Sequence, residues 1–172
     1  MHQDFSTKNE PFSAIHVDFN DISILHYPDM HSAYENARQL LGIADEYDFI
    51  LSNGCENAIK NVLLALRPNN IVYSVPTWEM IHVIACQLNL HEHVYPFKYD
   101  AAANCLYENI DTTKRYGVHY CTYFSNNFYA TKMTDCINAK YAIVDCSYAN
   151  PLGITAKLKS ILAENVILVG GF

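Results

Sequence analysis

The fold is decided by the stretch Tyr141-Ala142-Ile143-Val144-Asp145-Cys146-Ser147-Tyr148. Its hydrophobic residues run directly into a carboxylate, and the pattern predicts a buried strand over residues 140–145. A carboxylate at the end of a buried strand is costly to desolvate unless a cationic group pairs with it. Asp145 is therefore a candidate binding residue.

Outward from this strand, strand-like and helix-like segments alternate along the chain. Short hydrophobic runs bounded by turn residues predict strands over 48–51, 70–75, 93–97, 117–124, 140–145 and 165–169. Helical spacing predicts helices over 34–41, over the segment carrying Ile59, Val62, Leu63 and Leu66 before Pro68, and over 79–88. Residues 100–116 are expected to form an irregular connection. The alternation predicts an α/β domain with a largely parallel sheet and helices on both faces.

The length, composition and net charge of the chain limit the classes of protein to which it can belong. The 172 residues are 51% hydrophobic, enough for one real core, and the net charge of −7 argues against nucleic acid or an anionic membrane as the main partner. No hydrophobic run approaches the ~18 residues that cross a bilayer. We expect a cytoplasmic protein that binds small molecules or proteins.

Cysteine and histidine usage gives no metal motif. The six cysteines are scattered without a Cys-x-x-Cys pair, so they are expected to be free thiols. His91-Glu92-His93 would place two imidazoles on one face of a strand, but no third ligand is obvious. Among the eight histidines we therefore favour ordinary surface residues over a metal site.

Ligands of open α/β sheets lie beyond the carboxyl ends of the strands. The turn Ser52-Asn53-Gly54-Cys55-Glu56-Asn57 opens a helix whose free N–H groups would suit a phosphate; the alternative is a plain turn capped by Ser52 or Asn53. Trp78 follows the strand over 70–75 and is either a platform for a flat ligand or a core residue.

The order of these segments resembles the fold-type I aminotransferases that use pyridoxal phosphate (PLP), in particular the histidinol-phosphate aminotransferase-like group. The segments that carry the resemblance are Asn9-Glu10-Pro11-Phe12, Tyr27-Pro28-Asp29, Asn53-Gly54-Cys55-Glu56-Asn57-Ala58-Ile59, Pro76-Thr77-Trp78 and Asp145-Cys146-Ser147-Tyr148. The resemblance implies a three-layer PLP-transferase large domain, with an N-terminal arm and first helix over 1–44 and the N-terminal part of the PLP-binding domain over 45–172.

The resemblance also implies contacts to the cofactor. Gly54, Cys55 and Glu56 would direct backbone N–H groups at its phosphate, and Trp78 would stack on its pyridine ring. Asp145 would pair with the protonated ring nitrogen and so keep the ring an electron sink.

Further contacts implied by the resemblance lie elsewhere in the chain. Tyr148 and Asn127 would hydrogen-bond the 3′ oxygen of the ring, with Asn126 as the alternative to Asn127. Tyr27 would reach the phosphate bound by the partner subunit of a homodimer. The stretch 125–130 lacks the prolines and glycine that the family has there.

Residues 166–172 resemble the strand that leads into the family's Phe-Ser-Lys, so the Schiff-base lysine would follow Phe172. We therefore expect the front half of an enzyme, incomplete at the C-terminus, inactive alone and without a catalytic residue of its own. The whole enzyme would transfer an amino group between a small, possibly phosphorylated amino compound and a 2-oxo acid. The alternatives are a non-catalytic remnant that binds the cofactor phosphate or dimerises, and a PLP-dependent amino-acid-phosphate decarboxylase.

Overall fold

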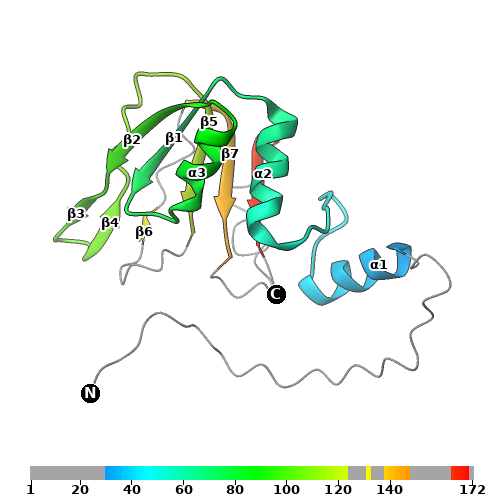
Figure 1. The fold of residues 1–172 in the computed structure, drawn as a ribbon. Helices are drawn as coiled ribbons and strands as arrows, with labels where there is room; N and C mark the ends of the chain where they lie inside the picture. Colours follow the sequence, from blue (N-terminus) through cyan, green and yellow to red (C-terminus); the bar gives the residue numbers. More distant parts are fainter. Residues whose placement is uncertain (1–29, 124–130, 133–137, 148–163, 171–172) are drawn as a thin grey trace, which may run out of the picture.

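The computed structural model describes residues 30–123, 131–132, 138–147 and 164–170. Its centre is a five-stranded sheet in which every pair of neighbouring strands is parallel (Figure 1). In spatial order the strands are β2 (His91–Pro96), β1 (Asn70–Val75), β5 (Tyr116–Thr122), β7 (Ala139–Asp145) and β8 (Val166–Val169). The predicted parallel sheet is confirmed, and each of these strands lies within two residues of a predicted one.

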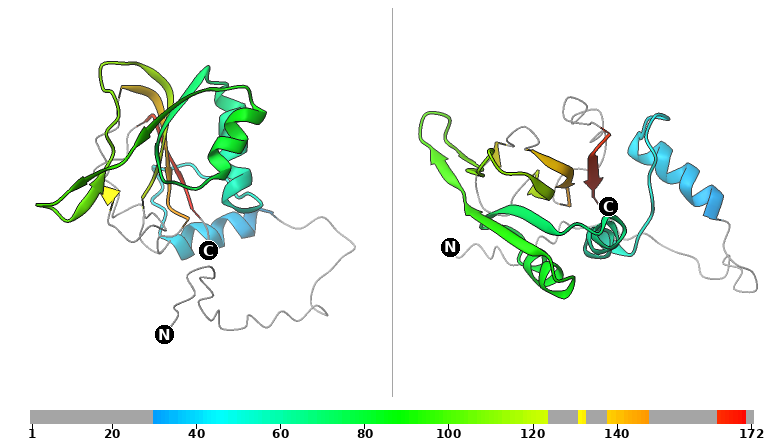
Figure 2. Two further views of the ribbon diagram at one scale, coloured as in Figure 1. Left: turned by 60° about the vertical axis from the view of Figure 1, so that its left-hand side comes forward. Right: turned by 90° about the horizontal axis from the view of Figure 1, so that it is seen from above.

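Helices α2 (Gly54–Leu66) and α3 (Met80–Gln87) lie on the same face of this sheet, as the view from above in Figure 2 makes plain. Their buried side chains meet those of every second residue of the central strands. The resulting core contains Ile59, Leu63, Ile71, Tyr73, Ile81, Ile84, Ala85, Val118, Tyr120, Ile143 and Val169. α1 (Met30–Leu41) is set to one side of the sheet. None of the described helices is long and apolar enough to cross a membrane.

The opposite face of the sheet is also buried. Val72 packs with Ile110 and Tyr116, and Val144 packs with Cys121 and Cys146. These two clusters contain no helical residue from the described part of the chain. The predicted second layer of helices is therefore not among the described residues.

A small second sheet replaces part of the predicted irregular connection. β3 (Lys98–Asp100) pairs antiparallel with β4 (Cys105–Tyr107), and β4 pairs parallel with β6 (Thr131–Lys132). The Asp100 carboxylate accepts hydrogen bonds from the N–H groups of Ala102 and Ala103, which fixes the turn between β3 and β4. The expectation of irregular structure throughout 100–116 was wrong, because a short hairpin needs only a suitable turn and no long apolar run.

The strand predicted over 48–51 is also wrong. Phe49 stacks on the Tyr34 ring of α1 at 5.2 Å between ring centroids, while Ile50 is 86% exposed. The Leu51 N–H donates to the Tyr34 hydroxyl at 3.3 Å, and Arg38 donates to the Tyr47 carbonyl at 3.1 Å. The Tyr34 hydroxyl of α1 thus binds the Leu51 N–H, which a neighbouring strand would otherwise have paired, and Arg38 binds the chain just before the predicted strand.

Candidate functional site

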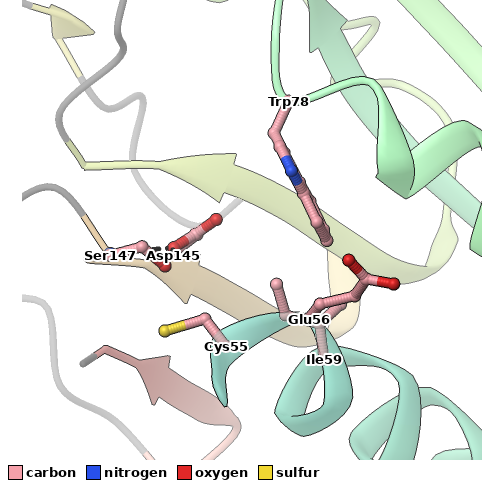
Figure 3. Close-up of a pocket in the computed structure, with 6 residues that line it drawn as sticks. All are labelled: Cys55, Glu56, Ile59, Trp78, Asp145 and Ser147. Atoms are coloured by element: carbon pink, nitrogen blue, oxygen red, sulfur yellow. Dashed lines mark hydrogen bonds between the residues drawn. The ribbon is translucent and has the colours of Figure 1, made fainter. Parts of the chain in front are cut away.

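A cavity of about 200 Å³ opens at the carboxyl ends of β1 and β7 (Figure 3). It is lined by Cys55, Glu56, Ile59, Trp78, Asp145 and Ser147. These residues come from the start of α2, the connection between β1 and α3, and the end of β7. The structure therefore brings together the residues predicted on three separate segments, at the edge of the sheet where ligands of this fold class bind.

Two carboxylates line this cavity, an exposed one of Glu56 and a buried one of Asp145. The Asp145 side chain is buried, with 3% of the residue exposed, and its Oδ2 accepts a hydrogen bond of 2.6 Å from the Tyr120 hydroxyl. Its Oδ1 accepts from the Ser147 N–H at 2.9 Å and from the Ser147 hydroxyl. Within the described part of the chain, no cationic side chain forms an ion pair with Asp145. A buried carboxylate held by neutral donors alone is poised to receive a cationic group.

Tyr120 is a stable hydrogen-bond donor to this carboxylate. Burial and the nearby charge of Asp145 raise the pKa of the Tyr120 hydroxyl well above its usual range. The hydroxyl therefore keeps its proton throughout the physiological pH range. Because each carboxylate oxygen has two lone pairs, the bonds from Tyr120 and Ser147 leave Asp145 able to accept from a ligand.

Trp78 is half-buried and lines the cavity from a different side. Its indole descends from the connection after β1 towards Glu56 and Ile59, as Figure 3 shows. The Trp78 side chain also packs against the main core. The backbone carbonyl of Trp78 accepts a hydrogen bond of 3.3 Å from the N–H of Ile81, at the start of α3. The two interpretations of Trp78 from sequence are thus compatible, since one face supports the core while the ring lines the cavity.

The start of α2 supplies backbone donors beside these groups. Gly54 has a φ of 82°, a conformation that glycine adopts without strain, and its N–H bonds to the Ser52 carbonyl at 2.9 Å. Asn53 makes no capping hydrogen bond, and the Ser52 hydroxyl donates to the Gly54 carbonyl instead of accepting an N–H. Capping of this turn by the Ser52 or Asn53 side chain is therefore wrong. Cys55 and Glu56 line the cavity, and neither of those two side chains caps the first-turn N–H groups of α2.

The remaining predicted site residues lie outside the described residues. They are Tyr27, Asn126, Asn127 and Tyr148. No lysine of the described part of the chain lines the cavity.

Sequence reasoning missed a second group of chemically active side chains. His82 and Cys86 of α3 meet Glu92 of β2 away from the cavity. The signal was present as a histidine and a cysteine four residues apart on a predicted helix. It could not be linked to Glu92 without knowing how β2 pairs with β1.

No protein-family model and no curated protein matches the sequence. Solved structures match the fold. L-threonine-O-3-phosphate decarboxylase from Porphyromonas gingivalis matches with a TM-score of 0.54 and 14% identity, over 80% of this chain and 44% of that one. N-succinyldiaminopimelate aminotransferase from Mycobacterium tuberculosis matches with a TM-score of 0.54 and 12% identity, over 86% of this chain and 46% of that one. The chain thus shares its fold with part of these enzymes and spans less than half of their length.

Proposed function

We propose that this chain forms the cofactor-binding part of a PLP-dependent enzyme that acts on an amino compound. The observation that carries the proposal is the buried Asp145 carboxylate, which lies at the carboxyl end of β7, lacks a cationic partner among the described residues, and shares a cavity with Trp78. A protonated pyridine ring offers both the missing positive charge and a flat surface for the indole. The shared fold with a decarboxylase and an aminotransferase supports the same proposal.

The residues of the cavity fit the parts of this cofactor. The first-turn N–H groups of α2 at Cys55 and Glu56 would bind the phosphate, helped by the positive end of the helix dipole. Trp78 would cover one face of the ring and exclude water from it. Asp145, oriented by Tyr120 and Ser147, would hold a proton on the ring nitrogen.

Asp145 then determines the chemistry. When bound, PLP takes up the electron pair released at a substrate carbon, and protonation of its ring nitrogen strengthens this effect. A buried carboxylate that cannot relax into water favours that protonated form strongly. Tyr120 and Ser147 would act as positioning residues, because both donate hydrogen bonds to this carboxylate.

The test is binding of pyridoxamine 5′-phosphate, which keeps the ring and phosphate but has no aldehyde to react with surface lysines. We expect saturable binding, measured by equilibrium dialysis and by quenching of Trp78, the single tryptophan of the chain. Asp145→Asn should weaken binding about ten- to a hundredfold, since a hydrogen bond to a charged group contributes roughly 1.5–3 kcal/mol. Asp45→Asn is the matched control, because the Asp45 side chain is fully exposed beside Arg38.

Pyridoxamine without its phosphate should bind far more weakly than the phosphorylated form. Equal affinities of wild type and Asp145→Asn for pyridoxamine 5′-phosphate would overturn the assignment of Asp145. Circular dichroism of each variant checks that the fold is retained.

Two reactions are consistent with this cavity, and we propose amino-group transfer to a 2-oxo acid as the first. Decarboxylation of an amino-acid phosphate is the alternative, because one of the solved structures that share the fold is such a decarboxylase. The assay uses a protein that contains these residues together with the lysine implied by the resemblance. Formation of a new amino acid from a 2-oxo acid supports transfer, whereas release of carbon dioxide supports the alternative.

A further inference from the structure

We propose that His82, Cys86 and Glu92 form a zinc site that joins α3 to β2, separate from the cofactor cavity. One ligand atom of each residue lies within 4.8 Å of the others, and together they offer one nitrogen, one sulfur and one oxygen. Mixed ligands of this kind suit Zn²⁺, whereas Mg²⁺ and Ca²⁺ prefer oxygen alone.

The backbone brings the three side chains together from two elements. His82 and Cys86 are four residues apart on α3 and therefore share one face of the helix. Glu92 pairs in register with Ile71, a buried residue of the core beneath α2 and α3, so Glu92 lies on the helix-covered face of the sheet. His91 and His93 lie on the other face, where their rings meet edge to face at 4.6 Å between centroids.

The spacing of the ligand atoms is within a few tenths of an ångström of that in a tetrahedral zinc site. Zinc bonds of about 2.0–2.3 Å at tetrahedral angles place pairs of ligand atoms roughly 3.3–3.6 Å apart. Here His82 Nδ1 lies 3.0 Å from Glu92 Oε1, Cys86 Sγ lies 3.9 Å from His82 Nδ1, and Cys86 Sγ lies 3.7 Å from Glu92 Oε1. Each separation changes by a few tenths of an ångström on zinc binding, which side-chain rotation supplies.

An outer hydrogen bond already orients Glu92. The hydroxyl of Tyr73, a buried residue of β1, donates to Glu92 Oε2 and leaves Oε1 for the metal. Such outer partners are typical of zinc sites, where they fix the orientation of the ligand.

The site is open on its solvent side. The His82 side chain is 63% exposed and Cys86 is exposed, whereas the Glu92 side chain is only 17% exposed. Three protein ligands leave a fourth position for water, the arrangement of zinc sites that exchange a ligand. Zinc binding would release the proton of the Cys86 thiol, which in the absence of zinc is the donor towards Glu92 Oε1 at 3.7 Å.

Cobalt(II) and zinc(II) are the probes, added to the reduced 172-residue chain. Cobalt should produce a thiolate-to-metal charge-transfer band and the strong visible bands of tetrahedral coordination. Cys86→Ser should abolish the charge-transfer band and weaken zinc binding by roughly 100-fold or more, and Tyr73→Phe by about tenfold. The matched controls are Cys55→Ser, a thiol of the cavity, and His91→Gln, the histidine beside Glu92 on the other face; both should retain the band.

Absence of the charge-transfer band in wild type would overturn the proposal. Undiminished zinc affinity in Cys86→Ser would overturn it as well, because the residues would then form only a hydrogen-bonded cluster. Neither outcome affects the proposed cofactor site, whose test depends on Asp145.

Discussion

Replacing Tyr120 by phenylalanine tests whether Asp145 depends on its neutral donors. The substitution removes one hydroxyl and leaves the ring in the core, where Tyr120 is 1% exposed. The lost bond, 2.6 Å from the hydroxyl to Asp145 Oδ2, connects two buried side chains on neighbouring strands. A hydrogen bond to a charged group contributes about 1.5–3 kcal/mol, and water cannot easily replace a donor at a buried oxygen.

We therefore expect Tyr120→Phe to lower the free energy of unfolding by about 2 kcal/mol. For a chain of this size that corresponds to a fall in Tm of roughly 4–8 °C. Urea denaturation followed by circular dichroism measures the first quantity, and a thermal melt measures the second. Tyr141→Phe is the matched control on the same sheet, because the Tyr141 hydroxyl makes no hydrogen bond to the described residues and its loss should cost little.

A double-mutant cycle with Asp145→Asn separates this bond from other effects. If the hydroxyl acts through the carboxylate, the two substitutions should be coupled by at least about 1 kcal/mol. A loss below about 0.5 kcal/mol in Tyr120→Phe, the ordinary scatter of neutral substitutions, would refute the reasoning.

Three further outcomes follow from other parts of the structure. Burial, with added effects of Asp145 and Cys55, raises the pKa of Cys146 from 9.0 to about 12. Above pH 9 the unfolded chain therefore loses a proton that the folded chain keeps, and the free energy of unfolding should fall as the pH rises. Cys146→Ala should make that fall shallower between pH 9 and 10, measured by denaturation at each pH. Gly117→Ala should cost about 1–3 kcal/mol, because a Cβ there would lie 2.8 Å from the Asn70 carbonyl oxygen. Gly170→Ala should be neutral in the same denaturation assay, because among the described residues its Cβ would meet nothing closer than 3.7 Å. Zinc at a hundredfold excess over its Kd should add about 2.7 kcal/mol of stability, and a thermal melt that does not shift would contradict this.

The sequence predicted those elements whose signal is local. β1 and the end of β7 are buried on both faces and so read as continuous hydrophobic segments, and β8 is a short run of valine, isoleucine and leucine. The helical stripe of α2 and its end before Pro68 were equally direct. In each of these segments the residue types and their spacing are sufficient to predict the conformation.

Part of the candidate site was also predicted from local sequence signals. Asp145 stood out because a carboxylate after an apolar strand needs a partner, and Trp78 and the start of α2 follow from the rule for strand ends. The donors that hold Asp145 could not be found, because Tyr120 lies on a different strand and becomes its neighbour only through the register of β5 with β7.

The predictions that were wrong or incomplete concern residues whose conformation or grouping depends on contacts with distant parts of the chain. Residues 48–51 have a strand-like composition, but Tyr34 of α1 binds the Leu51 N–H and stacks on Phe49, while Arg38 binds the carbonyl of Tyr47 just before the segment. Glu92 was grouped with its neighbours in sequence, whereas the alternation of β2 sends it to the opposite face from His91 and His93. In both cases the deciding partner is distant in the sequence, so no local pattern could identify it.

The cavity also imposes an order of events on synthesis of the protein. Its walls come from the start of α2 and from the end of β7, which are close in space but far apart in the sequence, with β1, β2 and β5 between them. When α2, β1 and α3 of a nascent chain have emerged from the ribosome, Asp145 has not yet emerged. The chain then lacks the charge that we expect to hold a cofactor. Parallel pairing over such long separations is also slow to form. Cofactor capture would thus report that β7 has joined the sheet, before β8, which follows it in the sequence, needs to pair with it.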